Sequence, residues 1–396
     1  MPNLEQVVIA SGVRTAIGAF GGSLAEIAPT DLASNVTAEA LKRAKVEPSE
    51  VGHVVFGNVI HTEPRDAYMA RVAALGAGLP VSVPALTVNR LCGSGLQAVV
   101  SGLQTVMLGD ADIVVAGGAE SMSRAPYSMR DARWGKRMGD ANMTDMLIAT
   151  LHDPFGNGHM GITAENIAAD RSISRETQDM IALRSHHRAR QAISEGRFSE
   201  QILPVEIKRG RELVAFDTDE HVRDTIDIEG LAKLRPAFRA DGTVTAGNAS
   251  GVNDGAAALV LMHADRAARD GIRPLARFVS YGFSGVDPSR MGLGPIPAVR
   301  SALSRAGLCV SDMDVIESNE AFAAQACAVA QELEFPEEKT NPNGGAIALG
   351  HPVGATGAII LVKLVYELQR IGGRYGLATL CIGGGQGIAV VVECGA

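Results

Sequence analysis

The sequence predicts an α/β protein made of two similar halves. Short β-branched runs alternate with segments of helical period, as in "VGHVVFGNVI" (51–60), the run after Cys92, and "DIVVAGGAE" (112–120). This alternation is typical of a largely parallel, buried sheet. An aliphatic strand also ends in paired glycines twice, once as "VVAGGAES" and once as "TLCIGGGQG", which indicates a weak internal duplication.

The second half repeats this rhythm in order. "PIPAVRSALSRAG" (295–307) predicts a helix, and "DVIESNEAF" (314–322) predicts a strand that runs into a helix. "VGATGAIILVKLVYELQRIG" (353–372) predicts a long helix. "YGLATLCIGGGQGIAVVVE" (375–393) then predicts two strands around a glycine turn.

Residues 121–250 differ in character from both halves. They are rich in Met, Arg, Asp and His and contain polar segments such as "FDTDEHVRDT". We expect an inserted loop domain here, because loops on a rigid scaffold commonly carry substrate contacts. The predicted division is 1–120 plus 251–271 for the N-terminal half, 121–250 for the loop domain, and 272–396 for the C-terminal half.

Composition excludes several classes of protein. The chain has 396 residues, 46% of them hydrophobic, which is enough for substantial buried cores. Its net charge of −8, and basic stretches ("MRDARWGKRMG", "EIKRGRE") with little aromatic character, argue against a nucleic-acid partner. Five cysteines without CxxC spacing indicate free thiols in a reducing compartment. No secretory pattern or membrane-length apolar run is present, so we expect a cytoplasmic protein that does not bind membranes.

Cys92 in "NRLCGSGLQAVV" is the first candidate catalytic residue. A free cysteine is most often a small buried hydrophobe, but Gly93 and Gly95 allow a sharp strand-to-helix turn here. A thiol at a helix N-terminus lies near the positive end of the dipole and unpaired N–H groups, which should lower its pKa and could hold an oxyanion. We therefore interpret Cys92 as a nucleophile on an elbow.

His351 and Cys381 are the other candidates. His351 lies between Gly350 and Pro352 in "NPNGGAIALGHPVGATGA", and it could be a hydrogen-bonded turn residue or the base for Cys92. Cys381 ends an apolar strand and precedes three glycines, so we expect its thiol to face a cavity, although buried strand cysteines are usually inert. Two thiols and one histidine around a cavity suggest acyl transfer.

Motifs along the whole chain resemble those of the thiolases, the acetyl-CoA C-acyltransferases. They are, in order, "NRLCGSGLQAVV", "GGAESMS", "HMGITAEN", "GNASGVNDGA", "NEAFAAQ", "NGGAIALGHPVGATGA" and "CIGGGQGIAVVVE". The likeness is greatest to bacterial biosynthetic-type β-ketothiolases, including those that supply polyhydroxyalkanoate synthesis. It implies a thiolase fold, with a five-layer αβαβα core of two duplicated halves.

The resemblance implies a reversible Claisen condensation of acyl-CoA with acetyl-CoA to 3-ketoacyl-CoA plus CoA, by a ping-pong mechanism. Cys92 would carry the acyl group and His351 would activate it. Cys381 would remove the α-proton of the second acetyl-CoA. Asn319, through a water, would join His351 in an oxyanion hole for the enolate, and the N–H groups of Cys92 and Gly383 would form the other hole.

The resemblance also places the coenzyme A arm in the loop domain. The implied contact residues for CoA are Leu151, His159, Met160, Arg223, Ala246, Ser250, Ala321 and Phe322. Arg223 would lie near the adenine end. The chain departs from the family at Gly230, where a small hydroxyl residue is frequent, so we expect no side-chain contact to CoA there.

Assembly and cofactors follow from the same resemblance. Residues 124–140 resemble the loop through which family dimers form tetramers, so we expect a homotetramer, a dimer of dimers. No metal and no bound cofactor are implied, because CoA thioesters are substrates. Fatty acid metabolism and polyhydroxyalkanoate biosynthesis are the expected settings.

Three alternative functions remain open from the residues alone. A decarboxylating ketoacyl synthase would share the fold but would have a second histidine where this chain has Cys381. A Cys–His thioesterase would need an activated water. A non-catalytic acyl-CoA-binding module would not need Cys92, His351 and Cys381 together.

Overall fold

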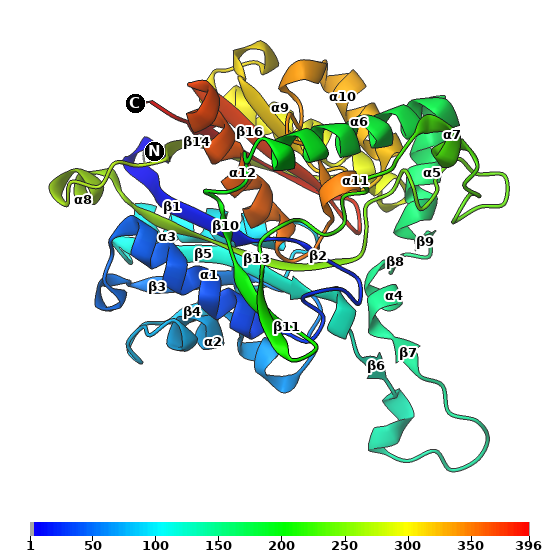
Figure 1. Cartoon of the computed structure of the whole chain (residues 1–396), viewed down its shortest axis with the longest axis horizontal. Coiled ribbons are helices and arrows are strands. Elements are labelled where there is room, and N and C mark those ends of the chain that lie inside the picture. Colours follow the sequence, from blue (N-terminus) through cyan, green and yellow to red (C-terminus); the bar gives the residue numbers. More distant parts are fainter. Residues whose placement is uncertain (1–3, 396) are drawn as a thin grey trace.

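The computed structural model describes residues 4–395 and contains an eleven-stranded central sheet (Figure 1). Nine of its strands lie in the order β15–β16–β17–β14–β1–β13–β5–β3–β4. Their bounds are β1 (Val7–Thr15), β3 (His53–Gly57), β4 (Ala85–Val88), β5 (Ile113–Ser121), β13 (Asn253–His263), β14 (Ala276–Gly285), β15 (Val315–Ser318), β16 (Tyr375–Ile382) and β17 (Gln386–Glu393). Two short strands, β2 (Gly18–Ala19) and β10 (Ile202–Leu203), pair with β13 and β1.

The two halves of this sheet have the same strand order. The N-terminal half runs β4–β3–β5–β13–β1, and the C-terminal half runs β15–β16–β17–β14. Thr340 forms a parallel bridge with Ile316 of β15, where β4 pairs with β3 in the other half. Among the described residues, β1 pairs with β14 at Val8 and Ile9, and this pairing joins the two halves. The shared order supports the internal duplication predicted from the glycine-ended strands.

Helices cover both outer faces of the sheet and fill the space between its halves. α1 (Pro29–Ala44) and α2 (Met69–Gly76) pack on the N-terminal half, and α9 (Pro295–Ala306) and α10 (Ala323–Leu333) lie on the C-terminal side (Figure 1). α3 (Ser94–Met107) and α12 (Thr356–Ile371) pack against each other in the middle, and α12 contacts strands of both halves. The order of layers is therefore αβαβα, as the resemblance implied.

The prediction of a largely parallel sheet was wrong. β3 pairs in parallel with β4 and β5, and β15 pairs in parallel with β16. However, β13 is antiparallel to both β1 and β5, and β17 is antiparallel to both β14 and β16. These returning strands are buried almost throughout, so their aliphatic runs have no polar alternation and look like strands of a parallel sheet.

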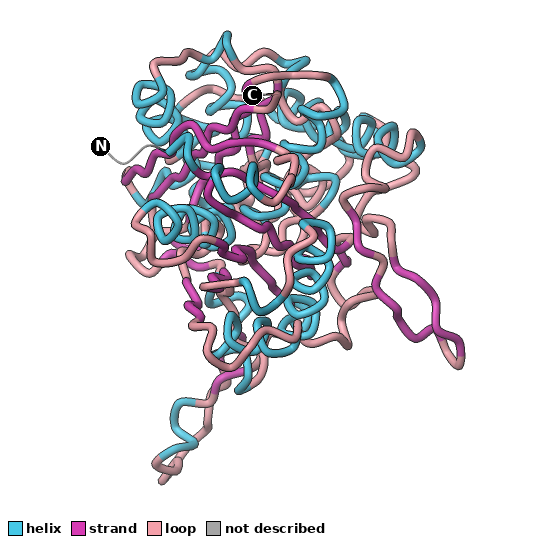
Figure 2. The backbone as a smooth tube through the Cα atoms, turned by 90° about the vertical axis from the view of Figure 1, so that its left-hand side faces the viewer, coloured by secondary structure: helices cyan, strands magenta, loops and turns pink. Residues whose placement is uncertain are grey.

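The segment between β5 and β13 contains four α-helices, two short 3-10 helices (Met122–Arg124 and Arg130–Arg133) and three small hairpins. The α-helices are α4 (Met146–Thr150), α5 (Met160–Asp170), α6 (Arg175–Ser194) and α7 (Ile228–Ala232). The hairpins are β6 (Tyr127–Ser128) with β7 (Thr144–Asp145), β8 (His152–Asp153) with β9 (Gly158–His159), and β11 (Val205–Arg209) with β12 (Glu212–Phe216). Two parts of this segment project from the body, the loop between β6 and β7 and the β11–β12 hairpin (Figure 2).

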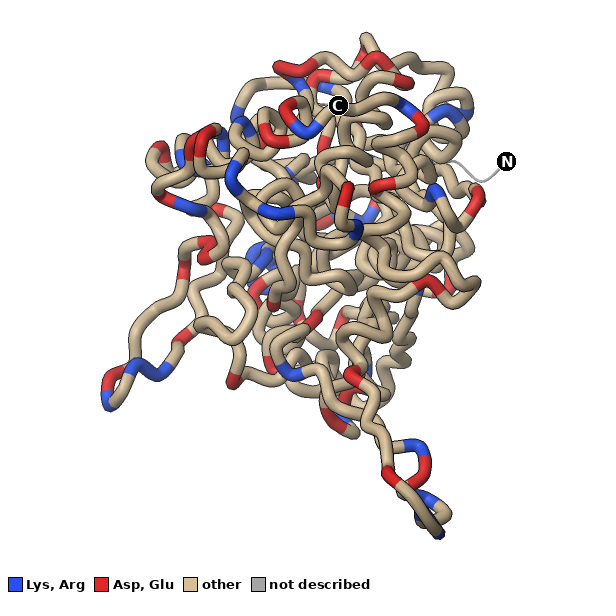
Figure 3. The backbone as a smooth tube through the Cα atoms, turned by 90° about the vertical axis from the view of Figure 1, so that its right-hand side faces the viewer, with Lys and Arg blue, Asp and Glu red and all other residues tan. Residues whose placement is uncertain are grey.

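Both projections carry charges of both signs (Figure 3). The two basic stretches singled out in the sequence therefore lie among acidic residues, and "EIKRGRE" forms part of the β11–β12 hairpin. Two short helices remain, α8 (Ala264–Arg269) after β13 and α11 (Ala346–Leu349) before His351. Among residues 4–395, no helix is both long and apolar enough to cross a membrane.

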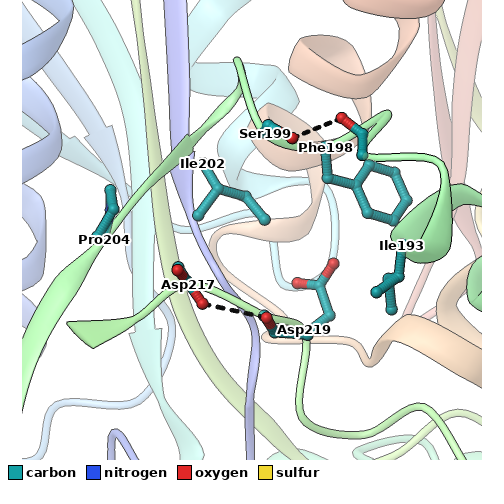
Figure 4. A pocket seen from close by; sticks show the side chains of 9 residues that line it. Ile193, Phe198, Ser199, Ile202, Pro204, Asp217 and Asp219 are labelled. Atoms are coloured by element: carbon teal, nitrogen blue, oxygen red, sulfur yellow. Dashed lines mark hydrogen bonds between the residues drawn. The ribbon is translucent and has the colours of Figure 1, made fainter. Parts of the chain in front are cut away.

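A buried ion pair anchors the inserted segment to β1. The Arg14 guanidinium donates two hydrogen bonds to the Asp219 carboxylate, at 2.7 and 2.9 Å, and a third to Gln201 at 2.8 Å. It also lies 4.9 Å from the centre of the Phe198 ring. A cavity of about 240 Å³ beside this contact is lined by Ile193, Phe198 and Asp219, among others (Figure 4). Its lining includes none of the predicted site residues.

Candidate active site

Cys92 lies on a tight turn between β4 and α3. Leu91 adopts a left-handed conformation with φ of 45°, which is uncommon for a residue with a side chain. The Gly93 N–H donates to the Arg90 carbonyl at 3.0 Å, and the Ser94 hydroxyl accepts from the Arg90 N–H and donates to the Leu91 carbonyl. The predicted elbow is thus present, with the helix starting at Ser94, two residues after the thiol.

Glycines bring the first turns of α3 and α12 together. A Cβ atom on Gly95 would lie 2.7 Å from the Ala358 nitrogen, and one on Gly357 would lie 2.3 Å from the Leu96 nitrogen. Neither position can hold a side chain without moving backbone. The segments that precede these helices carry Cys92 and His351, so this crossing places both residues in one region.

The neighbours of His351 fix its tautomer. The Thr356 hydroxyl donates its single proton to the Pro352 carbonyl at 2.8 Å, and it lies 2.7 Å from His351 Nδ1. Nδ1 must therefore carry the ring proton and donate it to Thr356 Oγ1. Nε2 is left with a lone pair and no hydrogen-bond partner among the described residues. Burial lowers the pKa of His351 to about 4, so the ring is neutral at pH 7 and can accept a proton.

Cys92 differs from expectation in its pKa. Burial raises the pKa of the thiol to about 11, although the N–H groups of Gly383 and of Cys92 itself act to lower it. The negative charge of Glu120 raises it further. The predicted lowering by the helix N-terminus was therefore wrong, because loss of hydration outweighs it. A thiol of this kind is protonated at rest and needs a base to react.

The glycine turn after β16 faces Cys92. The Gly383 N–H hydrogen-bonds to Cys92, and a Cβ atom on Gly383 would lie 3.0 Å from Leu91 Cδ1 and 3.6 Å from Met160 Sδ. Cys381 is buried in a cluster with Met160 and Phe322. Burial, and next the charge of Cys92, raises the pKa of Cys381, so the two thiols interact electrostatically.

Asn319 follows β15 directly and is buried. Its N–H donates to the Thr379 carbonyl on β16 at 3.0 Å. Only 2% of the residue is exposed, and neither its side-chain oxygen nor its nitrogen has a partner among the described residues. Buried amides are normally satisfied, so this group is free to bind a ligand or water.

The predicted CoA residues form connected groups. The Met160 N–H donates to the Leu151 carbonyl at 2.8 Å, and Met160 packs with Ala321 and Phe322. The Ser250 N–H donates to the Ala321 carbonyl at 3.0 Å, and Arg223 donates to the Ala246 carbonyl at 3.4 Å.

Phe238 connects His159 to this wall. Its ring stacks on His159 at 4.7 Å and meets Phe322 edge-on at 6.1 Å. No sequence pattern indicated Phe238, which lies in the irregular segment "RPAF". Thr356 was also missed, although a hydroxyl at the start of the helix after His351 could have suggested it. Among residues 4–395, no cluster of three His, Cys, Asp or Glu side chains could hold a metal ion.

Comparisons with known proteins agree with this geometry. Residues 7–265 match the model of the thiolase N-terminal domain, and residues 272–394 match that of the thiolase C-terminal domain. The chain belongs to the thiolase family. It is an acyltransferase, and CoA thioesters are its substrates rather than bound cofactors.

Similar thiolases include curated and solved proteins. The chain is 61% identical to beta-ketothiolase BktB of Cupriavidus necator, over 98% of this chain and 99% of that protein. It is 50% identical to acetyl-CoA acetyltransferase of Chromobacterium violaceum, over the same shares of the two chains. The structure of human mitochondrial 3-ketoacyl-CoA thiolase in complex with CoA has a TM-score of 0.97 at 46% identity, with both chains fully covered.

Proposed function

We propose that this thiolase condenses an acyl-CoA with acetyl-CoA, reversibly, to a 3-ketoacyl-CoA and CoA, and that acetoacetyl-CoA and short-chain homologues are its products. The observation that supports the site most strongly is the free lone pair of His351 Nε2. It provides the base that a protonated Cys92 needs. The roles below are assigned on this arrangement and on the family resemblance.

In the first half-reaction, His351 Nε2 takes the proton of Cys92 as the sulfur attacks the thioester carbonyl. The N–H groups of Cys92 and Gly383, which both point at the sulfur, hold the oxyanion. The carbon–sulfur bond to CoA breaks, and the departing CoA sulfur takes the proton back from His351. The products are acyl-Cys92, free CoA and neutral His351.

In the second half-reaction, Cys381 gives its proton to His351 and the resulting thiolate removes an α-proton from acetyl-CoA. The enolate oxygen accepts hydrogen bonds from protonated His351 and from the Asn319 amide, directly or through a water. The enolate carbon attacks acyl-Cys92, the carbon–sulfur bond breaks, and the Cys92 sulfur recovers its proton from His351.

The loop segment would hold the CoA arm. We assign Leu151, Met160, Ala321 and Phe322 to the apolar wall, and Arg223 to the adenine end. His159, Ala246 and Ser250 complete the set. The division at residues 120, 250 and 271 is part of this proposal.

We also infer the assembly and setting of the enzyme. Trp134 and Met138 are 89% and 82% exposed on the projecting loop, which supports a tetramer formed through residues 124–140. The free cysteines and the similarity to a bacterial beta-ketothiolase support a cytoplasmic enzyme of fatty acid metabolism or polyhydroxyalkanoate biosynthesis.

Peptide mapping after incubation with acetyl-CoA tests the assignment of Cys92. We expect a single acetylated site, at Cys92, and no accumulation of acetate. Label found mainly on Cys381 would reverse the two roles, and steady release of acetate would indicate a thioesterase. Thiolysis rates for 3-ketoacyl-CoAs of increasing length, with free CoA, then define the substrate range.

A further inference from the structure

The side-chain amide of Asn319 makes no hydrogen bond among the described residues. The position of Asn319 therefore depends on the residues next to it in the chain. β15 is the last strand at its end of the sheet, so one of its sides lacks a long strand partner. On that side the Asn341 N–H donates to the Ile316 carbonyl at 2.8 Å. The chain therefore runs beside β15 at this point without forming a strand.

The side chain of Asn341 continues the pairing where the backbone stops. Its Oδ1 accepts from the Ser318 N–H at 2.9 Å, and its Nδ2 donates to the Ser318 carbonyl at 2.8 Å. One side-chain amide thus pairs with both backbone groups of Ser318, as a neighbouring strand would. The same Nδ2 donates to Glu320 Oε1 at 2.9 Å. Asn341 therefore binds the residues on both sides of Asn319.

The backbone of Asn341 is held in an unusual conformation. Its φ is 46°, in the left-handed region, and it precedes Pro342, which disfavours most helical conformations at this position. Asparagine tolerates the left-handed region better than most residues. Such strain persists where the surroundings impose it, and it concentrates at functional sites.

A buried ion pair fixes the same loop from the other side. Lys363 Nζ on α12 lies 2.8 Å from Glu317 Oε2 on β15 and donates to the Gly344 carbonyl at 2.8 Å. Both charged side chains are nearly inaccessible. The Gly344 N–H donates back to the Asn341 carbonyl at 3.0 Å. Asn341, which binds the residues on both sides of Asn319, is thereby connected to α12, the helix that follows His351.

We propose that Asn341 is a positioning residue for the condensation step, because its amide fixes the Ser318–Glu320 turn and so the direction in which Asn319 presents its side chain to the enolate. This inference rests on the role proposed for Asn319. It predicts an effect on the second half-reaction alone, since acyl transfer between Cys92 and CoA does not use Asn319.

The test is the substitution Asn341→Gly, which removes the amide while glycine adopts the left-handed backbone freely. Two rates are measured: condensation of acetyl-CoA, and exchange of labelled CoA into acetyl-CoA. We expect condensation to fall by about 10- to 100-fold, the range for a displaced reacting group, and exchange to change by less than about 3-fold. Asn341→Asp keeps the acceptor for the Ser318 N–H but turns its second oxygen toward the Ser318 carbonyl and Glu320 Oε1, so we expect a loss of condensation at least as large, and this variant serves if the glycine variant does not fold.

Asn343→Ala is the matched control on the same loop. Asn343 is buried and bonds to Arg197 and Glu367 instead of the Asn319 turn. We expect this variant to lower the melting temperature without changing the ratio of the two rates. The variant Asn319→Ala is measured alongside. If it selectively slows condensation while Asn341→Gly leaves the ratio of condensation to exchange unchanged, the inference is overturned. If Asn319→Ala slows both reactions equally, the role proposed for Asn319 fails and the inference fails with it.

Discussion

The surroundings of His351 and one hydrogen bond set the state of its ring. Burial keeps the ring neutral, and Thr356 leaves the lone pair on Nε2. The sequence predicted the residue because its Gly-Pro setting is distinctive, but it could not predict the tautomer, which depends on where a hydroxyl on the next helix donates its proton. The pKa of Cys92 was predicted to be lowered and is raised, for a similar reason. The start of the helix can be recognised in the sequence, but the loss of hydration around the sulfur cannot.

Replacement of His351 should therefore change the reactivity of Cys92 with iodoacetamide. Burial raises the pKa of Cys92 to about 11 in the unchanged protein, so we expect alkylation to speed up with pH in both proteins. At pH 7 alkylation should be faster in the unchanged protein than in His351→Asn, since His351 Nε2 can accept the proton as the sulfur reacts and an asparagine amide cannot. The rates are measured by mass spectrometry of the Cys92 peptide. Equal rates in both proteins at pH 7 would mean that another group is the base.

Replacement of Cys381 should separate the half-reactions. A hydroxyl is a far weaker acid than a thiol, so the serine does not form the anion that would remove the α-proton. We therefore expect Cys381→Ser to lose condensation by at least ~100-fold, the lower range for general acid–base catalysis. Exchange of CoA label should persist, because it needs only Cys92 and His351. Parallel loss of both rates would indicate a structural role for Cys381. No loss of either would make His351 the first suspect for the α-proton base.

At the scale of elements, the prediction was best for segments with a clear period. The structure has helices at Pro295–Ala306 and Thr356–Ile371, and two strands around the glycine turn, close to the predicted ranges. Strand direction was not predictable, because β13 and β17 are buried on both faces and return antiparallel between other strands. The residues proposed for the CoA wall came from the resemblance, which did not point to Phe238, a residue in a segment without periodicity.

The helix crossing can be tested with one methyl group. In Gly95→Ala the new Cβ would meet the backbone of Ala358, so we expect both half-reactions to slow by more than ~10-fold as Cys92 and His351 separate. Gly102→Ala on the same helix is the control, since the three nearest neighbours of its new Cβ would be side-chain atoms of Val114, Ala116 and Leu261, at 3.0–3.2 Å. We expect lower stability but nearly normal kinetics there. Normal kinetics in Gly95→Ala would show that the crossing does not set the catalytic geometry.

At the scale of the whole molecule, buried histidines connect stability to pH. Burial lowers the pKa of His186 to about 3, against 6.5 for an unperturbed histidine. As pH falls below 6.5 the unfolded chain gains protons that the folded chain does not, so stability is lost in this range. Glu120, whose pKa burial raises to about 8, acts in the opposite direction. A comparison of the unchanged protein with a His186 variant separates the contribution of His186 to the pH dependence of stability from that of Glu120.

His186→Gln keeps an acceptor for the Arg223 N–H and does not titrate. We expect its free energy of unfolding to fall less between pH 7.5 and pH 5.0 than that of the unchanged protein. Urea unfolding at the two pH values measures the difference. An equal fall in both proteins would show that His186 titrates normally in the folded state.

The projecting loop gives the molecule a further testable property. Light scattering at micromolar concentration should give the mass of four chains. Trp134→Ser with Met138→Ser should reduce it to that of two, because these exposed apolar side chains would be buried between dimers. A stable monomer of the unchanged protein, or a tetramer that survives both substitutions, would contradict the assignment of this loop.

The close packing at Gly95 and Gly357 has a consequence for how such an enzyme can diversify. The crossing that places Cys92 and His351 in one region is set largely by main-chain contacts at these two glycines, to Ala358 and Leu96. The residues proposed to hold CoA lie largely on a different part of the chain, between β5 and β13. Selection can therefore reshape the acyl pocket for longer or branched chains while the chemistry is inherited unchanged, and a protein engineer can exchange that segment between relatives provided that these two glycines are kept.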